Sequence, residues 1–255
     1  QLQATALSLT GTFFAPVLIK GPAKSGAVAV AGQDSQMVSA LLFLAAILAG
    51  TTTITVTDPG EKPWVDLSLN WLERLGVKCH RDGYHKFSVT GRILPAFNYT
   101  VPADFSSAAY PVASALLQQR ELLLENMDWQ DPQGDKQLFS VLQKMGALLE
   151  IDPVKKSLQV RRTPVMQGCK IDVNDFIDAV PLLAVIGCYA KGQTVLYNAQ
   201  NARYKESDRL KTITCELRKM GADIVENADG LVIRQAVLQG ANNLTSHQDH
   251  RIAMS

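Results

Sequence analysis

One arrangement of apolar and polar residues occurs three times along the chain. Each copy begins with an apolar run of helical length, continues into a short strand, and then forms an amphipathic helix that closes on a glycine and precedes another strand. We expect the apolar helices at 39–48, 107–117 and 178–189, the next strands at 50–56, 121–125 and 193–197, and the closing helices at 66–75, 135–145 and 208–220. The closing glycines, for which the pattern predicts left-handed C-caps, are Gly76, Gly146 and Gly221.

The alternation of helices and strands predicts an α/β fold. The threonine- and valine-rich runs favour strands because β-branched side chains fit a pleated sheet. Between the first and second copies Gly91, Pro95 and Pro102 interrupt any long element, so we place a domain boundary near Pro102, with domains at 1–102 and 103–255. Composition alone also allows an ordinary surface connection inside one domain.

Composition and charge narrow the classes of partner. Apolar residues make up 47% of the chain, which is enough for globular cores. The 25 Lys and Arg residues balance 24 Asp and Glu residues, so no uniform field points to nucleic acid or an anionic membrane as partner. The longest apolar stretch, at 40–49, is shorter than the roughly 20 residues that cross a bilayer, and we expect a buried helix or strand there.

Cysteines and histidines give no metal pattern. The four cysteines contain no C-x-x-C pair, two of them, Cys188 and Cys215, lie in apolar or helical patterns where a thiol behaves as a small hydrophobe, and a reducing cytoplasmic location fits best. The four histidines show no metal-ligand spacing with cysteine or with one another. We therefore expect neither a metal nor another cofactor.

The strongest local signal is the charged segment 201–210, where five ionisable side chains fall within the seven residues from Arg203 to Arg209. The segment opens the last closing helix, where free N–H groups and the helix dipole favour anions. Glu206, Ser207 and Asp208 suit a helix start on those grounds alone. A solvated helix start is the alternative for an isolated charge run.

Two further signals come from Asp178 and from Asp249-His250-Arg251. Asp178 lies beside an apolar run, where a carboxylate is costly unless it is paired or used, although a helix N-cap before Pro181 is the alternative. Arg251 precedes another apolar run and is suited to bidentate capture of carboxylate or phosphate, although a cap or surface pair would also fit. Together the three signals supply carboxylates for acid–base work and cations for phosphorylated or carboxylated small molecules.

Five ordered motifs resemble one enzyme family. These are Asp-Ser-Gln at 34–36, Ser-Ser-Ala-Ala-Tyr at 106–110, the helix start at Asp178, Asn-x-x-x-Lys-Glu-Ser-Asp-Arg at 201–209, and Asp-His-Arg-Ile-Ala-Met at 249–254. In this order and spacing they resemble 5-enolpyruvylshikimate-3-phosphate (EPSP) synthase over nearly the whole chain. The resemblance implies the enolpyruvyl transferase fold, an inside-out α/β barrel of repeated βαβαββ units, in two domains with ligands bound in the cleft between them.

The resemblance also implies an activity in aromatic amino-acid biosynthesis. The family transfers the enolpyruvyl group of phosphoenolpyruvate to the 5-hydroxyl of shikimate 3-phosphate and releases phosphate, so the implied partners are small molecules. The carried-over catalytic residues are the base Asp178 and the acid Glu206. The carried-over substrate contacts are Ser35 and Gln36 on the phosphate side, Asn201 and Lys205 for shikimate 3-phosphate, and Arg209 and Arg251 for phosphoenolpyruvate. We expect a monomer in which Arg209→Ala weakens phosphoenolpyruvate capture far more than folding.

Departures from the family pattern leave two alternatives. Asp34 and Glu61 stand where the family often has hydroxyls near the substrate phosphate, where an acid repels unless Lys20, Lys24 or Lys62 compensates or the acids point away. The family's N-terminal lysine-serine segment, its phosphoenolpyruvate loop and a late lysine have no counterpart, so we expect an internal fragment that is inactive alone. The alternatives are a uridine-diphosphate amino-sugar enolpyruvyl transferase and a non-catalytic anion-binding module of the same fold.

Overall fold

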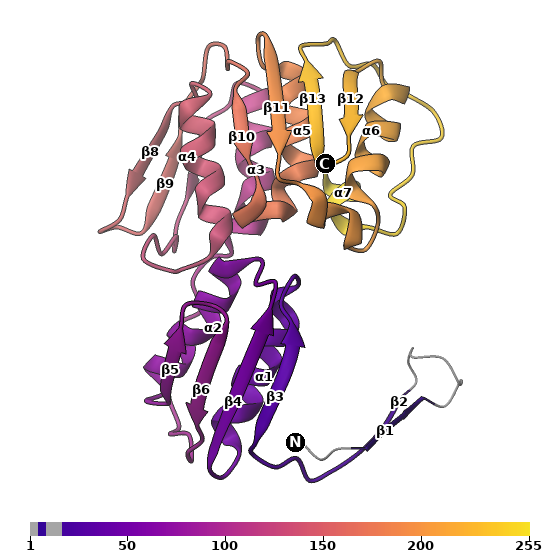
Figure 1. Cartoon of the computed structure of the whole chain (residues 1–255). Helices are drawn as coiled ribbons and strands as arrows, with labels where there is room; N and C mark the ends of the chain where they lie inside the picture. The colour runs from indigo at the N-terminus through magenta and orange to yellow at the C-terminus, as the bar shows by residue number, and fades with distance from the viewer. Residues whose placement is uncertain (1–4, 9–16) are drawn as a thin grey trace. The chain divides into compact units, whose positions relative to one another are not determined.

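The chain forms two compact units, Gln1–Tyr99 and Thr100–Ser255, in a computed structural model that describes residues 5–8 and 17–255 (Figure 1). The division lies three residues before Pro102, and the assignment of 1–102 and 103–255 to two family domains stays a prediction. At the start of the first unit, strands β1 (Thr5–Ser8) and β2 (Val17–Lys20) pair antiparallel.

The first unit contains one complete βαβαββ copy. Its elements are β3 (Ala27–Ala31), α1 (Ser35–Ile47), β4 (Thr51–Thr57), α2 (Lys62–Arg74), β5 (Lys78–Asp82) and β6 (Lys86–Thr90). The sheet order is β3-β4-β6-β5, with β3 parallel to β4 and the other pairs antiparallel. Figure 1 shows α1 and α2 together behind this sheet, and Val38, Leu42, Ile54 and Phe87 form part of the core between them.

The second unit contains a complete copy with the same layout. Its elements are β10 (Lys170–Asp172), the 3-10 helix η2 (Asn174–Ala179), α5 (Val180–Tyr189), β11 (Gln193–Tyr197), the 3-10 helix η3 (Gln200–Tyr204), α6 (Arg209–Lys219), β12 (Asp223–Asn227) and β13 (Gly230–Arg234). The sheet order is β10-β11-β13-β12, and again only the first pair is parallel. Helix α5 is buried at nearly every position, because its sequence is apolar on all sides.

The middle copy lies in the same unit and has a three-stranded sheet. Its elements are α3 (Phe105–Leu117), β7 (Leu122–Leu124), the 3-10 helix η1 (Gly134–Lys136), α4 (Gln137–Lys144), β8 (Leu149–Asp152) and β9 (Ser157–Val160), with strand order β7-β9-β8. The short helix α7 (His250–Met254) follows β13 after a long loop. The predicted α/β fold and its three copies are therefore confirmed.

Each closing helix ends at the predicted glycine. Gly76, Gly146 and Gly221 have φ values of +69°, +100° and +91°, and the residue after each donates a backbone hydrogen bond to the last turn of its helix. Only glycine adopts this left-handed conformation without a steric penalty, so the sequence marks three helix ends directly. The C-cap predictions are confirmed.

In every copy a hydrogen bond that involves a side chain joins the starts of the two helices. In the first copy Ser35 Oγ donates to Glu61 Oε2 over 2.9 Å, and in the second the Phe105 amide donates to Gln133 Oε1 over 3.0 Å. In the third Arg209 Nη1 donates to Asp178 Oδ1 over 2.6 Å. We call each of these a helix-start contact. The contact in the first copy includes one predicted site residue, Ser35, and the contact in the third copy joins two, Asp178 and Arg209.

Two expectations about apolar residues need correction. The apolar stretch 40–49 is a helix, but only one face of α1 is buried, and Phe43 and Ile47 are 42% and 62% exposed. Cys188 is buried in α5 as expected, whereas Cys215 is exposed because it lies on the outer face of α6. Among the described residues, no helix combines the length and the apolar character that a membrane crossing would need.

Candidate active site

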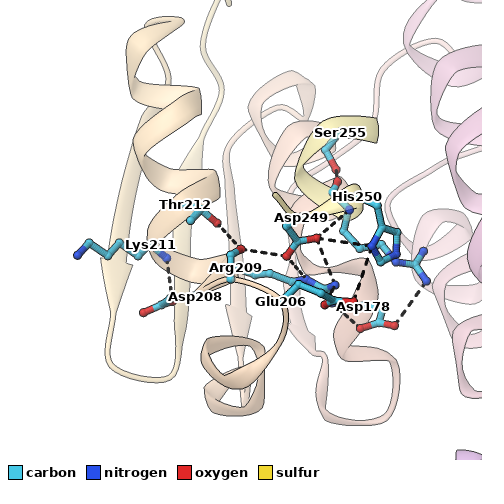
Figure 2. A network of polar contacts seen from close by, with 11 residues as sticks. Asp178, Glu206, Asp208, Arg209, Lys211, Thr212, Asp249, His250 and Ser255 are labelled. Atoms are coloured by element: carbon cyan, nitrogen blue, oxygen red, sulfur yellow. Dashed lines mark hydrogen bonds and ion pairs between the residues drawn. The ribbon is translucent and has the colours of Figure 1, made fainter. Parts of the chain in front are cut away.

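Arg209 joins three carboxylates that are far apart in sequence (Figure 2). It is the first residue of α6 and is only 1% exposed. Its Nη1 donates to Asp178 Oδ1 over 2.6 Å, its Nη2 to Glu206 Oε2 over 2.6 Å, and its Nε to Asp249 Oδ2 over 2.8 Å. All three donating nitrogens of the guanidinium are therefore engaged, and we call these four residues the arginine cluster.

Helix caps place two residues of the cluster, Arg209 and Asp249. Asp208 caps α6 by accepting the Lys211 N–H over 3.1 Å, which sets Arg209 in the first turn. Asp249 caps α7 by accepting the Arg251 N–H over 2.8 Å, and its side chain is fully buried. Each cap thus fixes a cluster residue through the backbone of a helix start.

Asp178 forms ion pairs and does not cap a helix. It lies at the end of η2, and the N-cap of α5 is Ala179, which makes no side-chain cap hydrogen bond. Its Oδ2 is 3.5 Å from Arg251 Nη2, so the carboxylate lies between two guanidinium groups. The N-cap alternative for Asp178 is therefore wrong, and the ion-paired interpretation fits its 26% side-chain exposure.

Electrostatics keep the centre of the cluster charged. Burial by itself lowers the pKa of Arg209. The hydrogen bond to Asp249 and the charges of Asp178, Asp249 and Glu206 outweigh this effect, so the pKa of Arg209 is raised overall. Burial by itself raises the pKa of Asp249, but hydrogen bonds from Arg209, the Arg251 N–H and Ser207 lower that pKa overall. The Arg209–Asp249 pair is thus a buried ion pair with both charges retained.

A small pocket lies beside Asp178 and Arg251. Its cavity volume is only about 10 Å³, about the least that can hold one water molecule, and its lining includes Ser106, Tyr110, Asp135 and Leu138. The Arg251 guanidinium lies 6.0 Å from the centre of the Tyr110 ring. Ser106 Oγ and Arg251 Nε are buried without a hydrogen-bond partner among the described residues. The Ser-Ser-Ala-Ala-Tyr motif therefore lines a small hollow next to the cluster, a role that the motif did not reveal.

The other predicted site residues lie in two places. Asn201 and Lys205, both partly buried, lie on and directly after η3, in the segment that leads to Glu206. Ser35 and Gln36 belong to the first unit, at the start of α1, where Ser35 is buried and Gln36 is exposed. Among the predicted residues, the structure therefore groups Asp178, Glu206, Arg209 and Arg251.

Glu61 and Asp34 both act at the start of α1. Glu61 is 4% exposed, and its Oε2 accepts the Ser35 N–H over 3.2 Å and the Ser35 hydroxyl over 2.9 Å. Asp34 caps the helix by accepting the Gln36 N–H over 2.8 Å. Glu61 has a φ of +44°, an uncommon left-handed conformation that turns the chain just before α2. A carboxylate of the chain itself thus occupies the α1 start, where an incoming anion would otherwise find free N–H groups.

Glu206, Asp249 and His250 bring three possible metal-ligand atoms within 4.8 Å of one another. Glu206 and Asp249 already accept hydrogen bonds from Arg209. The guanidinium supplies the positive charge at this point, and a metal ion would have to share the same oxygens with it. We therefore assign these carboxylates to the arginine cluster.

Sequence reasoning missed Asp249 as a cluster residue and Ser207 as its hydrogen-bond partner. Ser207 Oγ donates to Asp249 Oδ2 over 2.9 Å, the same oxygen that accepts from Arg209 Nε. The sequence does contain a signal for Asp249, because this residue directly precedes an apolar run of helical character and is therefore placed to cap that helix. The burial of its side chain follows only from the tertiary fold.

Glu216, also on α6, accepts hydrogen bonds from the loop 243–249 and is 8% exposed. Burial by itself raises its pKa, but hydrogen bonds from Lys219, His247 and the Thr245 N–H lower the pKa from 4.5 to about 2. A glutamate in an unfolded chain retains its ordinary pKa. Between these pH values the folded chain binds fewer protons than the unfolded chain, so Glu216 stabilises fully above pH 4.5 and loses that effect as the pH falls to about 2.

Glu216→Gln is accordingly expected to lower the free energy of unfolding by about 2 kcal/mol at pH 7. The difference between wild type and variant should shrink as the pH falls from about 5 to about 3, because the wild-type carboxylate then loses its charge advantage. Urea unfolding at pH 7, 5 and 3 measures this. If the difference in free energy of unfolding between wild type and Glu216→Gln stays the same at all three pH values, the charge of Glu216 does not stabilise the fold.

The fold matches that of EPSP synthases of known structure. An EPSP synthase from Acinetobacter baumannii aligns with 99% of this chain and 60% of its own, with a TM-score of 0.75 and 26% sequence identity. The chain belongs to the EPSP synthase (3-phosphoshikimate 1-carboxyvinyltransferase) family, whose pattern matches residues 1–255.

Curated relatives agree with this family. The 3-phosphoshikimate 1-carboxyvinyltransferase of Acetivibrio thermocellus is 41% identical over 256 residues, which cover 100% of this chain and 59% of the relative. That of Chlamydia muridarum is 43% identical over 242 residues, which cover 94% of this chain and 54% of the relative. The chain therefore spans between half and three fifths of the length of these relatives.

Proposed function

We propose that this chain contributes the acid–base and anion-binding residues of the EPSP synthase reaction. In that reaction the enolpyruvyl group of phosphoenolpyruvate is transferred to the 5-hydroxyl of shikimate 3-phosphate and phosphate is released. The observation that carries the proposal is the arginine cluster, in which Asp178 and Glu206 bind to the same guanidinium within 2.6 Å each. Family membership supports the same activity.

The two acids suit opposite proton transfers. We propose that Asp178 takes the proton from the attacking hydroxyl and that Glu206 delivers the proton to the methylene carbon. Their side chains are 26% and 49% exposed, so both can reach a ligand, whereas Arg209 is almost fully buried. Arg209 would then fix the two carboxylates relative to each other, which matters because acid–base catalysis needs both groups in position at once.

Arg251 is the guanidinium that we assign to ligand anions. Its side chain is 13% exposed, its Nη2 lies 3.5 Å from Asp178 Oδ2, and it lines the small pocket. A planar guanidinium there can donate to a carboxylate or a phosphate oxygen. Asn201 and Lys205 on the adjacent segment would contact shikimate 3-phosphate, with Ser35 and Gln36 on the phosphate side.

Arg251→Ala is expected to weaken phosphoenolpyruvate binding about tenfold, because one charge-assisted hydrogen bond is lost. Titration calorimetry in the presence of shikimate 3-phosphate measures the effect. The matched control is Arg234→Ala, which removes an arginine that is 52% exposed and pairs with Asp223. Equal weakening by both changes would mean that Arg251 acts only through overall charge.

The proposal is tested first with the unaltered chain. Calorimetry with shikimate 3-phosphate, then with phosphoenolpyruvate, should show saturable binding. Phosphate release should be weak or absent, because this chain spans only 54–59% of the length of its curated relatives. No binding of either compound would overturn the proposal. We further propose a monomer that works in the reducing cytoplasm without a cofactor, and the four free cysteines support a reducing location.

One observation favours a second candidate function, a non-catalytic anion-binding module. The Glu61 carboxylate accepts both donors of Ser35, so these two donors are already engaged within the chain and not directed to the phosphate of a substrate. Binding of phosphoenolpyruvate without any binding of shikimate 3-phosphate would support this candidate. The amino-sugar transferase alternative is not favoured, because the curated relatives are named 3-phosphoshikimate 1-carboxyvinyltransferases.

A further inference from the structure

Glu216 is a buried acid that the proposed chemistry does not use. It lies on α6, and its two oxygens accept from Lys219 Nζ over 2.8 and 2.9 Å. They also accept the Thr245 N–H over 3.0 Å and contact His247 Nε2 at 2.8 Å. Lys219 Nζ in turn donates to the Asn243 carbonyl over 3.1 Å. Two α6 side chains thus contact every second residue of the loop from 243 to 247.

The same helix binds both ends of this loop. At the first turn of α6, Arg209 pairs with Asp249, the residue that ends the loop and caps α7. Glu216 lies seven residues after Arg209, which is two helical turns and places both side chains on the same face. The loop 243–249 is therefore fixed to one face of α6 at two separate points, directly before Arg251.

The backbone of the loop needs such fixing. Asn243, His247 and Gln248 have φ values of +62°, +53° and +59°, and none of them is glycine. Left-handed conformations at non-glycine residues persist only where surrounding contacts impose them. Two of the three residues are direct partners of the Glu216–Lys219 pair, and the third, Gln248, lies between His247 and the buried Asp249.

We propose that Glu216 is a positioning residue for the arginine cluster. By fixing the loop 243–249 in its strained conformation, Glu216 sets where Asp249 meets Arg209 and where Arg251 meets Asp178. The functional meaning of this inference rests on the proposed function, because it concerns the same site. The structural part, that one carboxylate on α6 controls the order of the loop and of the α7 start, can be tested without any substrate.

Amide hydrogen exchange in Glu216→Ala and Glu216→Gln tests the structural part. The reporters are the amides of Arg251 and Ala253, which donate to the Asp249 side chain and carbonyl and do not touch Glu216. We expect exchange at both amides to rise at least tenfold in Glu216→Ala and less in Glu216→Gln, which can still accept from the loop. Exchange in β13 should remain unchanged.

The matched control is Asp223→Ala, which removes an acid that is 54% exposed, lies in the same unit and pairs with Arg234. It should leave the Arg251 and Ala253 amides as in wild type. His247→Ala provides a second variant that weakens the same contact from the loop side, and it should also raise exchange at these amides. Unchanged exchange in both Glu216 variants, or an equal rise throughout the second unit, would overturn the proposal.

Phosphoenolpyruvate titration separates the positioning role of Glu216 from the proposed function. If wild type binds and Glu216→Ala binds at least tenfold more weakly while Asp223→Ala binds normally, Glu216 positions the anion site. If Glu216→Ala binds as wild type although its loop exchanges faster, the positioning role is overturned. If even wild type fails to bind, the proposed function fails, and hydrogen exchange still decides whether Glu216 orders the loop.

Discussion

Arg209→Ala is expected to lower the free energy of unfolding of the second unit by about 3–5 kcal/mol, because it leaves buried carboxylates without their partner. Asp249 is fully buried and would lose its main counter-charge, and Asp178 would lose its 2.6 Å contact. This revises the expectation from sequence that the change would affect ligand capture far more than folding. The 1% exposure of Arg209 is the reason.

Urea unfolding followed by circular dichroism measures the effect. Arg209→Lys should recover part of the loss, because it restores the charge but not the three-way fork. Adding Asp249→Asn to Arg209→Ala should also recover stability, since it removes the unpaired buried charge. A loss below about 1 kcal/mol for Arg209→Ala would contradict the cluster as a structural centre.

Glu61→Ser is expected to raise the affinity of the chain for inorganic phosphate on the order of 100-fold. The change frees the N–H and hydroxyl of Ser35 at the start of α1 and removes a negative charge that would lie against the phosphate. Two charges about 4 Å apart near a protein surface interact by roughly 4 kcal/mol before salt screening, which makes this gain reasonable. Glu61 is itself a non-glycine residue at φ +44° and makes no side-chain cap hydrogen bond, so serine there meets the same backbone demand and the start of α2 should be retained.

Titration of each variant with phosphate and with shikimate 3-phosphate at low salt measures the gain. Glu61→Gln removes the charge but keeps an acceptor for Ser35, so an intermediate gain is expected. The control is Glu73→Ser, which removes an exposed acid from the other end of α2. Equal affinity in Glu61→Ser and wild type would show that the α1 start does not bind phosphate, and it would favour the non-catalytic candidate function.

Much of the fold could be predicted from the sequence because its signals are local. Apolar spacing predicted the helices, and the glycines at 76, 146 and 221 marked their ends, since both depend on residues a few positions apart. The exposed face of α1 and the exposed Cys215 were not predictable in the same way. Which side of a helix is covered depends on what packs there, and a uniformly apolar run carries no information about it.

The site was only partly predictable for a related reason. The motifs named Asp178, Glu206, Arg209 and Arg251, but not that Arg209 would be buried among the acids. Glu61 and Ser35 are 26 residues apart, and Arg209 and Asp249 are 40 apart, so their contacts exist only in the folded chain. From the sequence, Glu61 could be compensated by a lysine or could point away from the phosphate, and the structure adds two hydrogen bonds from Ser35 to its carboxylate.

The recurrence of the helix-start contact suggests how such a protein diversifies. The same place in each copy carries a serine–carboxylate pair, a backbone amide–glutamine pair, or an arginine–carboxylate pair. Duplication of one ancestral unit would supply this junction several times over, and each duplicate could then exchange the chemistry of its junction while its sheet and glycine-capped helix stayed intact. Directed evolution of new anion specificities would accordingly do best by randomising these paired positions and leaving the surrounding scaffold alone.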